Sequence, residues 1–119
     1  MVNYKDLYVN QGASFVESLT LVDNYNLPID LTNYDVQARM SRSTSASDYM
    51  TIDIYTNDPA NGAIQMSLTS DATSNLTNIK YVYELVAIDD VNNVTKLLEG
   101  LVIIDRGIGL STDKYIISY

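Results

Sequence analysis

Two stretches between Gln11 and Arg42 alternate apolar and polar residues, and this alternation constrains the fold more than any other feature of the chain. Successive side chains of a β-strand point to opposite faces, so each stretch predicts a strand with one face toward a core. The segment between them, residues 23–28, is rich in Asn and Asp and ends in Pro, which predicts a turn. Two such strands need further strands to cover their apolar rows. The rows are Phe15, Leu19 and Leu21, interrupted by Glu17, and Tyr34, Val36, Ala38 and Met40, with Ile29 and Leu31 expected to close one end of the core.

The same alternation recurs along the rest of the chain, with strong turn signals at residues 57–62 and 90–93. Ser70 is expected to cap a single helical turn from Asp71 to Leu76. Strands are predicted at residues 4–9, 15–22, 34–41, 48–56, 63–69, 79–89 and 94–105. About seven short strands with at most one short helical turn are typical of an all-β fold, an antiparallel immunoglobulin-like β-sandwich. A small barrel is the alternative architecture.

Two of the predicted strands carry further signals. The segment 79–89 is apolar on both faces, which indicates a central strand or an interface. Within it, Tyr81 and Tyr83 are expected to lie in the core, or one of them to hydrogen-bond the backbone. Gly100 lies inside the last strand, where glycine indicates a bulge or a close approach of another segment.

The chain has 119 residues, which suffices for one domain with a substantial core. We expect residues 1–105 to form the sandwich and residues 106–119 to form an extended tail. Cysteine and histidine are absent, which removes disulfides, thiolate chemistry, the commonest general base and the commonest metal ligand. We therefore expect a protein that is not an enzyme, with no catalytic residues, no metal site and no cofactor.

The formal net charge of −8 at pH 7 narrows the choice of partners. Binding to nucleic acid depends on Lys and Arg, so we expect no nucleic-acid partner, and an anionic membrane surface is equally unfavourable. No apolar run is long enough to span a membrane, and the first residues lack the parts of a signal peptide. We expect the protein to act without secretion.

Tyrosine supplies the two candidate interaction sites. Tyr49 and Tyr55 lie on an otherwise polar face of one predicted strand, where their rings could stack on a sugar or pack against another protein. Serving as ordinary half-buried strand residues is the simpler interpretation. The apolar end of the tail, which contains Tyr115, Ile116, Ile117 and Tyr119, is expected to add a strand either to its own sheet or to a neighbouring subunit.

Three segments carry a resemblance to a known group of proteins. They are QGASF at residues 11–15, LPIDLTNYDVQARM at residues 27–40 and YVYELVAIDDVNNVTKLLEGLVII at residues 81–104. Together they resemble the immunoglobulin-like structural domains of bacteriophages, similar to the N-terminal domain of baseplate upper proteins and to head or tail accessory proteins. The resemblance covers about residues 10–105, and Asn93 stands where the group has glycine, a change that a left-handed backbone position tolerates.

The resemblance implies a virion component that is assembled in the host cytoplasm and has no catalytic role. Its position would be that of a head decoration protein, a neck protein or a baseplate-associated subunit. Baseplate proteins of this kind would continue beyond residue 119, so we expect a free-standing accessory subunit. Its partners would be other phage structural proteins or copies of itself, contacted through the apolar end of the tail. The alternative is a carbohydrate-binding module that uses Tyr49 and Tyr55 to bind a surface glycan.

Overall fold

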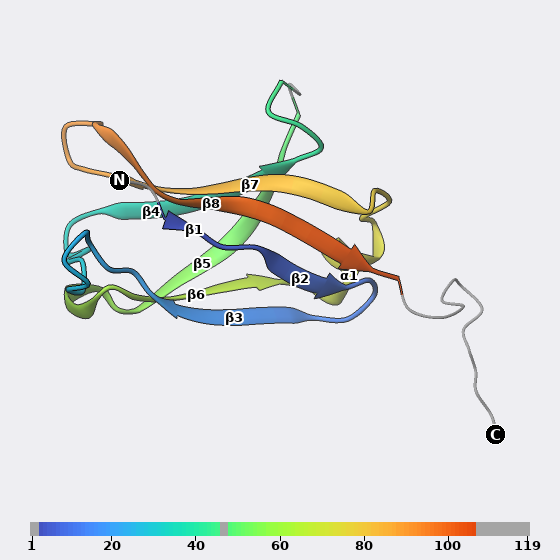
Figure 1. The fold of residues 1–119 in the computed structure, drawn as a ribbon, viewed down its shortest axis with the longest axis horizontal. Coiled ribbons are helices and arrows are strands. Elements are labelled where there is room, and N and C mark those ends of the chain that lie inside the picture. Colours follow the sequence, from blue (N-terminus) through green and yellow to red (C-terminus); the bar gives the residue numbers. More distant parts are fainter. Residues whose placement is uncertain (1–2, 46–47, 107–119) are drawn as a thin grey trace.

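The computed structural model describes residues 3–45 and 48–106, and the statements below concern these residues. They form an all-β arrangement with two short helical segments (Figure 1). The elements are β1 (Asn3–Tyr4), β2 (Leu7–Asn10), β3 (Phe15–Thr20), β4 (Asp35–Ser41), β5 (Met50–Asp58), the 3-10 turn η1 (Pro59–Asn61), β6 (Ala63–Leu68), α1 (Ser70–Ser74), β7 (Lys80–Ile88) and β8 (Val94–Asp105).

The strands form one continuous path in the order β1-β8-β7-β4-β5-β6-β3, with β2 also beside β8. Strand β5 joins the two halves of this path. Its first part, from Met50 to Ile52, pairs with β4, and from Asp53 onward it pairs with β6. The sheet curls at this shared strand, so that β3 and β6 lie below β7 and β8 in Figure 1. The core lies inside the curl.

The expectation of a purely antiparallel sheet is wrong, because β1 and β2 pair with β8 in the parallel sense. A hairpin forces its two strands to run in opposite directions, but β1 and β2 are the first strands and β8 is the last. The chain leaves β2 for β3 on the other half of the sheet, so no hairpin sets the direction of the first strands. All the other strand pairs are antiparallel.

The two predicted inward rows are confirmed in part, because Phe15, Leu21, Ala38 and Met40 are buried whereas Tyr34 is exposed. Most of the inward side chains are buried, while Leu19, Val36 and Ile54 are partly buried and pack against the core. Most residues between them are exposed or half-buried, but Val86 of β7, at a shift in the register with β8, is buried as well. Met66, Leu85 and Val102 are fully buried near the middle of three different strands. Because apolar area is buried from both halves, the hydrophobic effect holds the curl together. The buried inward residues include Phe15, Leu21, Ala38, Met40, Ile52, Ile64, Leu68, Tyr81, Tyr83, Ala87 and Ile104.

Loops and α1 close the two ends of the core. At one end, Leu31 is buried and Ile29 packs against the core, as predicted. At the other end lie α1 and the buried Leu76. The hydroxyl of Thr73, which is fully buried, accepts a hydrogen bond from the Gly12 N–H at 3.0 Å and donates to the Ala13 carbonyl at 2.9 Å. This side chain ties α1 to the loop between β2 and β3.

The predicted opening strand is interrupted at Lys5 and Asp6, which is why the structure has eight strands rather than about seven. The Lys5 carbonyl turns toward Gly100 and accepts a hydrogen bond from the Tyr83 hydroxyl at 2.6 Å. The Asp6 carboxylate accepts the Leu101 N–H at 3.1 Å. Any side chain at Gly100 would collide with the Lys5 carbonyl oxygen. Gly100 therefore allows a close approach, which is one of its two predicted roles.

Three local predictions need correction. The structure contains both η1 and α1 rather than at most one helical turn, because Pro59 favours the start of a further short helix after β5. The residue that caps α1 is Thr69 and not Ser70, since its side chain accepts the Ala72 N–H at 3.1 Å. The left-handed position of the β7–β8 connection is occupied by Asn92, with φ of 68°, and not by Asn93.

The tail lies outside the described residues, apart from Arg106. Its guanidinium donates a hydrogen bond to the Thr77 carbonyl at 2.9 Å.

Candidate functional site on the outer face of β4, β7 and β8

A row of charged and aromatic side chains crosses the outer face of the sheet. The register pairs Arg39 of β4 with Glu84 of β7, Glu84 with Glu99 of β8, and Glu99 with Tyr4 of β1. Paired residues of neighbouring strands project from the same face, so these four side chains form one row across four strands. With about 4.8 Å between neighbouring strands, the row is about 14 Å long.

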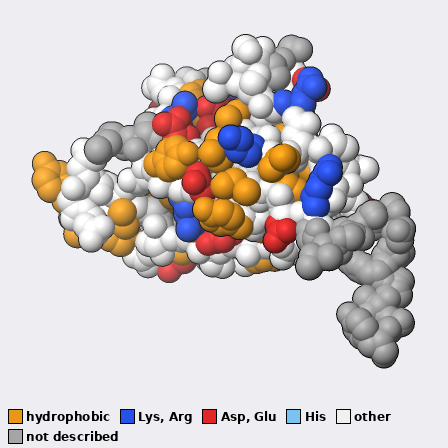
Figure 2. All heavy atoms as spheres, turned by 45° about the vertical axis from the view of Figure 1, so that its right-hand side comes forward, with side chains coloured by type: hydrophobic (Ala, Val, Ile, Leu, Met, Phe, Trp, Pro, Cys, Tyr) orange, Lys and Arg blue, Asp and Glu red, His pale blue; other side chains and the backbone are white. Residues whose placement is uncertain are grey.

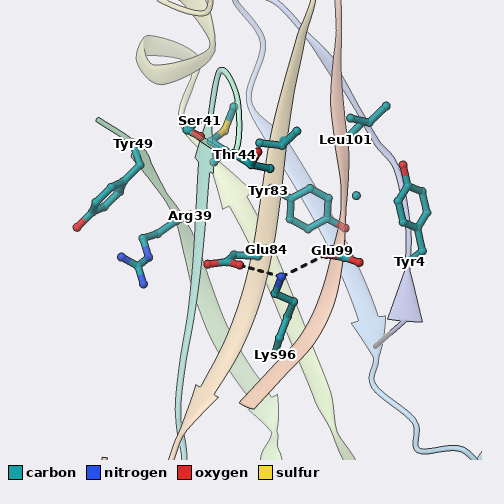
Figure 3. A pocket seen from close by; sticks show the side chains of 13 residues that line it. Tyr4, Arg39, Ser41, Thr44, Tyr49, Tyr83, Glu84, Lys96, Glu99 and Leu101 are labelled. Atoms are coloured by element: carbon teal, nitrogen blue, oxygen red, sulfur yellow. Dashed lines mark hydrogen bonds and ion pairs between the residues drawn. The ribbon is translucent and has the colours of Figure 1, made fainter. Parts of the chain in front are cut away.

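Lys96 lies at the centre of this row. Its Nζ is 3.3 Å from Glu84 Oε1 and 3.3 Å from Glu99 Oε1 (Figure 3). The hydrogen bond with Glu99, followed by that with Glu84, raises the pKa of Lys96 above its ordinary value. The three side chains are all partly exposed, and ion pairs of this kind contribute little to stability. They do give the face a fixed pattern of one positive charge between two negative charges.

Tyrosines flank the charged cluster on both sides. On one side the Arg39 guanidinium lies over the Tyr49 ring, 4.9 Å from its centroid, which is a cation–π contact. On the other side lies Tyr4, a residue that is 62% exposed; Figure 3 shows its ring beside Glu99 and Leu101. A hydrogen bond with Asp6, assisted by partial desolvation, raises the pKa of the Tyr4 phenol. The phenol is therefore a hydrogen-bond donor at neutral pH.

These side chains line a hollow of about 550 Å³, which also contacts Ser41, Thr44 and Leu101. Apolar groups surround it on the same face: Val82 and Ile103 are half-buried and Tyr8 is exposed. Figure 2 shows hydrophobic side chains gathered at the centre of one face of the molecule, with acidic and basic side chains between them. The site is thus a broad surface with a shallow hollow and fixed charges.

The structure separates the two tyrosines that were singled out from the sequence. Both are exposed rather than half-buried, Tyr49 by 58% and Tyr55 by 66%. Tyr49 directly precedes β5 and Tyr55 lies within it, six residues further on, or about 20 Å along an extended strand. Tyr49 lines the hollow, whereas Tyr55 lies opposite Gln65 on the part of β5 that pairs with β6. The two rings cannot stack on the same sugar ring.

Two further tyrosines that the sequence analysis singled out lie in the core. Tyr81 and Tyr83 are buried, and each of their hydroxyls takes part in a hydrogen bond to the backbone, with the Asn78 N–H and with the Lys5 carbonyl respectively. Burial, with the nearby carboxylates of Asp6 and Glu17, raises the pKa of Tyr83. The tail residues Tyr115, Ile116, Ile117 and Tyr119 lie outside the described residues.

Tyr4 and Tyr8 belong to the outer face but had no role in the sequence analysis. Tyr4, Asp6 and Tyr8 are each two residues apart in the sequence, a spacing that places side chains on one face of a strand. Their meeting with Glu99 and Ile103 depends on the parallel pairing to β8, which no local pattern encodes. The Glu84–Lys96–Glu99 cluster depends in the same way on the register of β7 and β8.

The groups at this face can make non-covalent contacts. The face offers aromatic rings, aliphatic side chains, one lysine and several carboxylates. Within residues 3–45 and 48–106, no group of three or more acidic, histidine or cysteine side chains is arranged to hold a metal ion. None of the described helices is long and apolar enough to cross a membrane.

No protein-family model matches the chain, and no curated protein sequence matches it significantly. Among solved structures, the Listeria monocytogenes internalin-like protein lmo2027 is similar with a TM-score of 0.48 and 17% identity over 87% of this chain. The chain spans 28% of the length of that protein. The Lin-41 filamin domain is similar with a TM-score of 0.44 and 16% identity over 84% of each chain. These values are too low to indicate a shared function.

Proposed function

We propose that this chain is a structural subunit of a bacteriophage particle, without catalytic activity, that acts through protein–protein contacts. The role would be that of a head decoration protein, a neck protein or a baseplate-associated subunit in the virion. The motif resemblance along residues 10–105 supports the phage assignment. The outer face of β4, β7 and β8 is the observation that carries the contact role.

That face has the composition of a protein interface. Tyrosine and arginine are enriched in interfaces and contribute many of their strongest contacts, and Tyr4, Tyr49 and Arg39 lie there together. A small-molecule site usually encloses most of its ligand in a deep apolar pocket. Here the tyrosines at both sides of the hollow are more than half exposed. A flat partner surface fits this shape better than an enclosed substrate.

We further propose that the curled sheet is an immunoglobulin-like sandwich. The strand orders β3-β6-β5 and β4-β7-β8 correspond to the B-E-D and C-F-G sets of that fold, and the chain order agrees as well. The first strands, β1 and β2, pair with the last strand, β8, and not with β3, which corresponds to strand B. The shared strand β5 would then link the two layers.

Quantitative mass spectrometry of purified phage particles from the source tests the structural role. A copy number close to that of the major capsid protein would identify a head decoration protein, and a much smaller number would identify a neck or baseplate subunit. Absence from the particles would reject the proposal. A Tyr4→Ala/Leu101→Ala variant is expected to lower incorporation at least about fivefold, because central interface residues carry most of the binding energy. Tyr25→Ala, in the exposed turn before β4, is the matched control and is expected to incorporate normally.

The second candidate is a carbohydrate-binding module, favoured by the exposed rings of Tyr49 and Tyr55. The two rings are about 20 Å apart, so a sugar would stack on only one of them. Arg39 already lies over the Tyr49 ring, whereas no cation lies over the Tyr55 ring among the described residues, so Tyr55 is the better candidate for stacking on a sugar. Glycan binding that is lost on Tyr55→Ala, and that does not depend on residues 115–119, would support this function over the structural one.

A further inference from the structure

Strands β4 and β5 separate partway along their length, and the gap between them is a hollow of about 390 Å³. Strand β4 pairs with β7 from Asp35 to Ser41, but with β5 only from Ala38 to Met40. From Asp53 onward β5 follows β6 instead. We call this hollow the β4–β5 fork; it is lined by residues 36–39 of β4 and residues 51–54 of β5, with Tyr49 at its rim.

The fork leaves part of β4 as an open sheet edge. From Asp35 to Gln37, the side of β4 that faces away from β7 has no neighbouring strand within the described part of the chain. Alternate residues of a strand direct their N–H and C=O groups to opposite sides. This edge therefore offers unpaired backbone donors and acceptors, and such an edge can accept an extended segment as an additional strand.

Side chains at the fork define what that segment must look like. Val36 and Ile54 are only partly buried and pack against the core, which gives the fork an apolar floor. Asp53 lines the fork, and Asp35 lies at the open end of β4. The guanidinium of Arg39 already lies over the Tyr49 ring. A fitting segment is extended, apolar on its inward side and next to a positive charge.

We propose that the fork binds residues Tyr115–Tyr119 of a second copy of this chain as an added β-strand. This inference rests on the proposed function as a structural subunit, and it names the partner in one of its contacts. The segment YIISY is uncharged and consists mostly of residues that favour strands. Lys114, which directly precedes it, supplies the positive charge that complements Asp35 and Asp53.

Geometry favours a second copy over the chain's own segment. Gln37 pairs with Val86, and Val86 pairs with Lys96. Arg106 therefore lies about 30 Å along the sheet from the level of Gln37, and two strand spacings of about 4.8 Å to the side. The chain from Arg106 to Tyr115 spans about 30 Å when fully extended. The chain's own segment would reach the fork only under full extension, which costs conformational entropy, and a second copy has no such constraint.

Sedimentation velocity of the full chain over a range of concentrations tests this contact. Ile117→Lys places a charge within the added strand, and Val36→Lys places one on the floor of the fork. Each substitution is expected to weaken self-association at least about tenfold. Hydrogen exchange is expected to slow at amides within Asp35–Gln37 when the wild-type chain associates, because they gain strand partners.

Two matched lysine variants serve as controls. Ser118→Lys lies on the opposite face of the added strand from Ile117, and Val16→Lys lies on the exposed face of β3. Both are expected to associate as the wild-type chain does. Thermal unfolding checks that Val36→Lys is folded, and if it is not, Ile117→Lys still decides the matter because it leaves the fork intact.

A chain that stays monomeric up to about 1 mM would overturn the inference. So would association that is indifferent to Ile117→Lys, or exchange protection that appears away from β4. These results are independent of the particle measurement. A chain that is present in particles but monomeric in solution rejects only the fork contact, and association through the fork with absence from particles rejects only the phage role.

Discussion

The phenol of Tyr83 connects the centre of the sheet to its edge. The side chain comes from β7 and is buried in the core, and its hydroxyl donates to the Lys5 carbonyl between β1 and β2 at 2.6 Å. Burial disfavours the phenolate, which would also lose this hydrogen bond, and so the pKa of Tyr83 is raised. A residue in the core thus fixes the path of β1 and β2, which pair only with β8 among the strands of the described residues.

Replacing Tyr83 with Phe is expected to lower the free energy of unfolding by about 1 kcal/mol at neutral pH, because the hydrogen bond to Lys5 is lost. The wild-type advantage is present below the unfolded-state pKa of about 10 and is lost as the pH rises through the raised folded-state pKa. Urea unfolding at neutral and alkaline pH measures both effects. The Tyr55→Phe variant, whose hydroxyl lies on the exposed face, is the control. A difference between wild type and Tyr83→Phe that grows at alkaline pH would contradict this assignment.

At the scale of the element, β1 and β2 form one edge strand with a kink that Gly100 makes possible. The Lys5 carbonyl occupies the space where a side chain at position 100 would lie. The Asp6 carboxylate takes the Leu101 N–H, so a side chain replaces a backbone carbonyl within the ladder. A kinked and partly acidic edge is also a poor template for unwanted strand pairing.

Gly100→Ala is expected to lower the free energy of unfolding by about 1–3 kcal/mol, because the added methyl group must displace the Lys5 backbone or the Tyr83 ring. Amides of β1 and β2 should exchange faster while those of β6 keep their protection. Thr95→Ala, at an exposed position of the same strand, should change stability by less than about 0.5 kcal/mol. Unchanged exchange in β2 would show that the close approach is not required for the kink.

At the scale of the whole molecule, two kinds of contact hold the curl closed. Met66 of β6 is fully buried and lies between Glu17 of β3 and Ile54 of β5 in the register. The Lys5–Glu17 ion pair, with 3.6 Å between Nζ and Oε2, links the two open edges of the curled sheet at a partly exposed position. Glu17, which interrupts the apolar row of β3, thus has a partner for its charge at the edge of the core.

The burial of Met66 is expected to contribute far more to the free energy of unfolding than the Lys5–Glu17 ion pair does. Met66→Ala should cost about 2–5 kcal/mol, since it leaves a cavity in a closely packed core. Glu17→Gln should cost less than about 1 kcal/mol, because exposed ion pairs gain little over water and are screened by salt. Chemical unfolding of both variants at low and high salt measures the difference. If Glu17→Gln proved the more damaging change, the curl would depend on its edges rather than on its core.

Local pattern determined where the strands lie and which side chains point inward. A period of two residues is a property of each strand alone, so Phe15, Met40 and Met66 could be placed in the core before any strand was paired. The same rule placed Tyr49 and Tyr55 on the outward face, but it did not show that they are exposed rather than half-buried. The positions of the turns followed from Asn, Asp, Gly and Pro, although which Asn adopts the left-handed conformation was missed by one residue.

Tertiary structure alone decided which strands become neighbours. The parallel pairing of β1 and β2 with β8, the sharing of β5 between two halves and the fork beside β4 all join residues that are distant in the sequence. Such pairings are selected by how the apolar faces pack together, and many pairings satisfy the same local alternation. The row from Arg39 to Tyr4 exists only after that selection, and so the candidate interaction surface could not be read from the chain. The sequence by itself determined the strands and their inward faces, and packing decided the surface that they present.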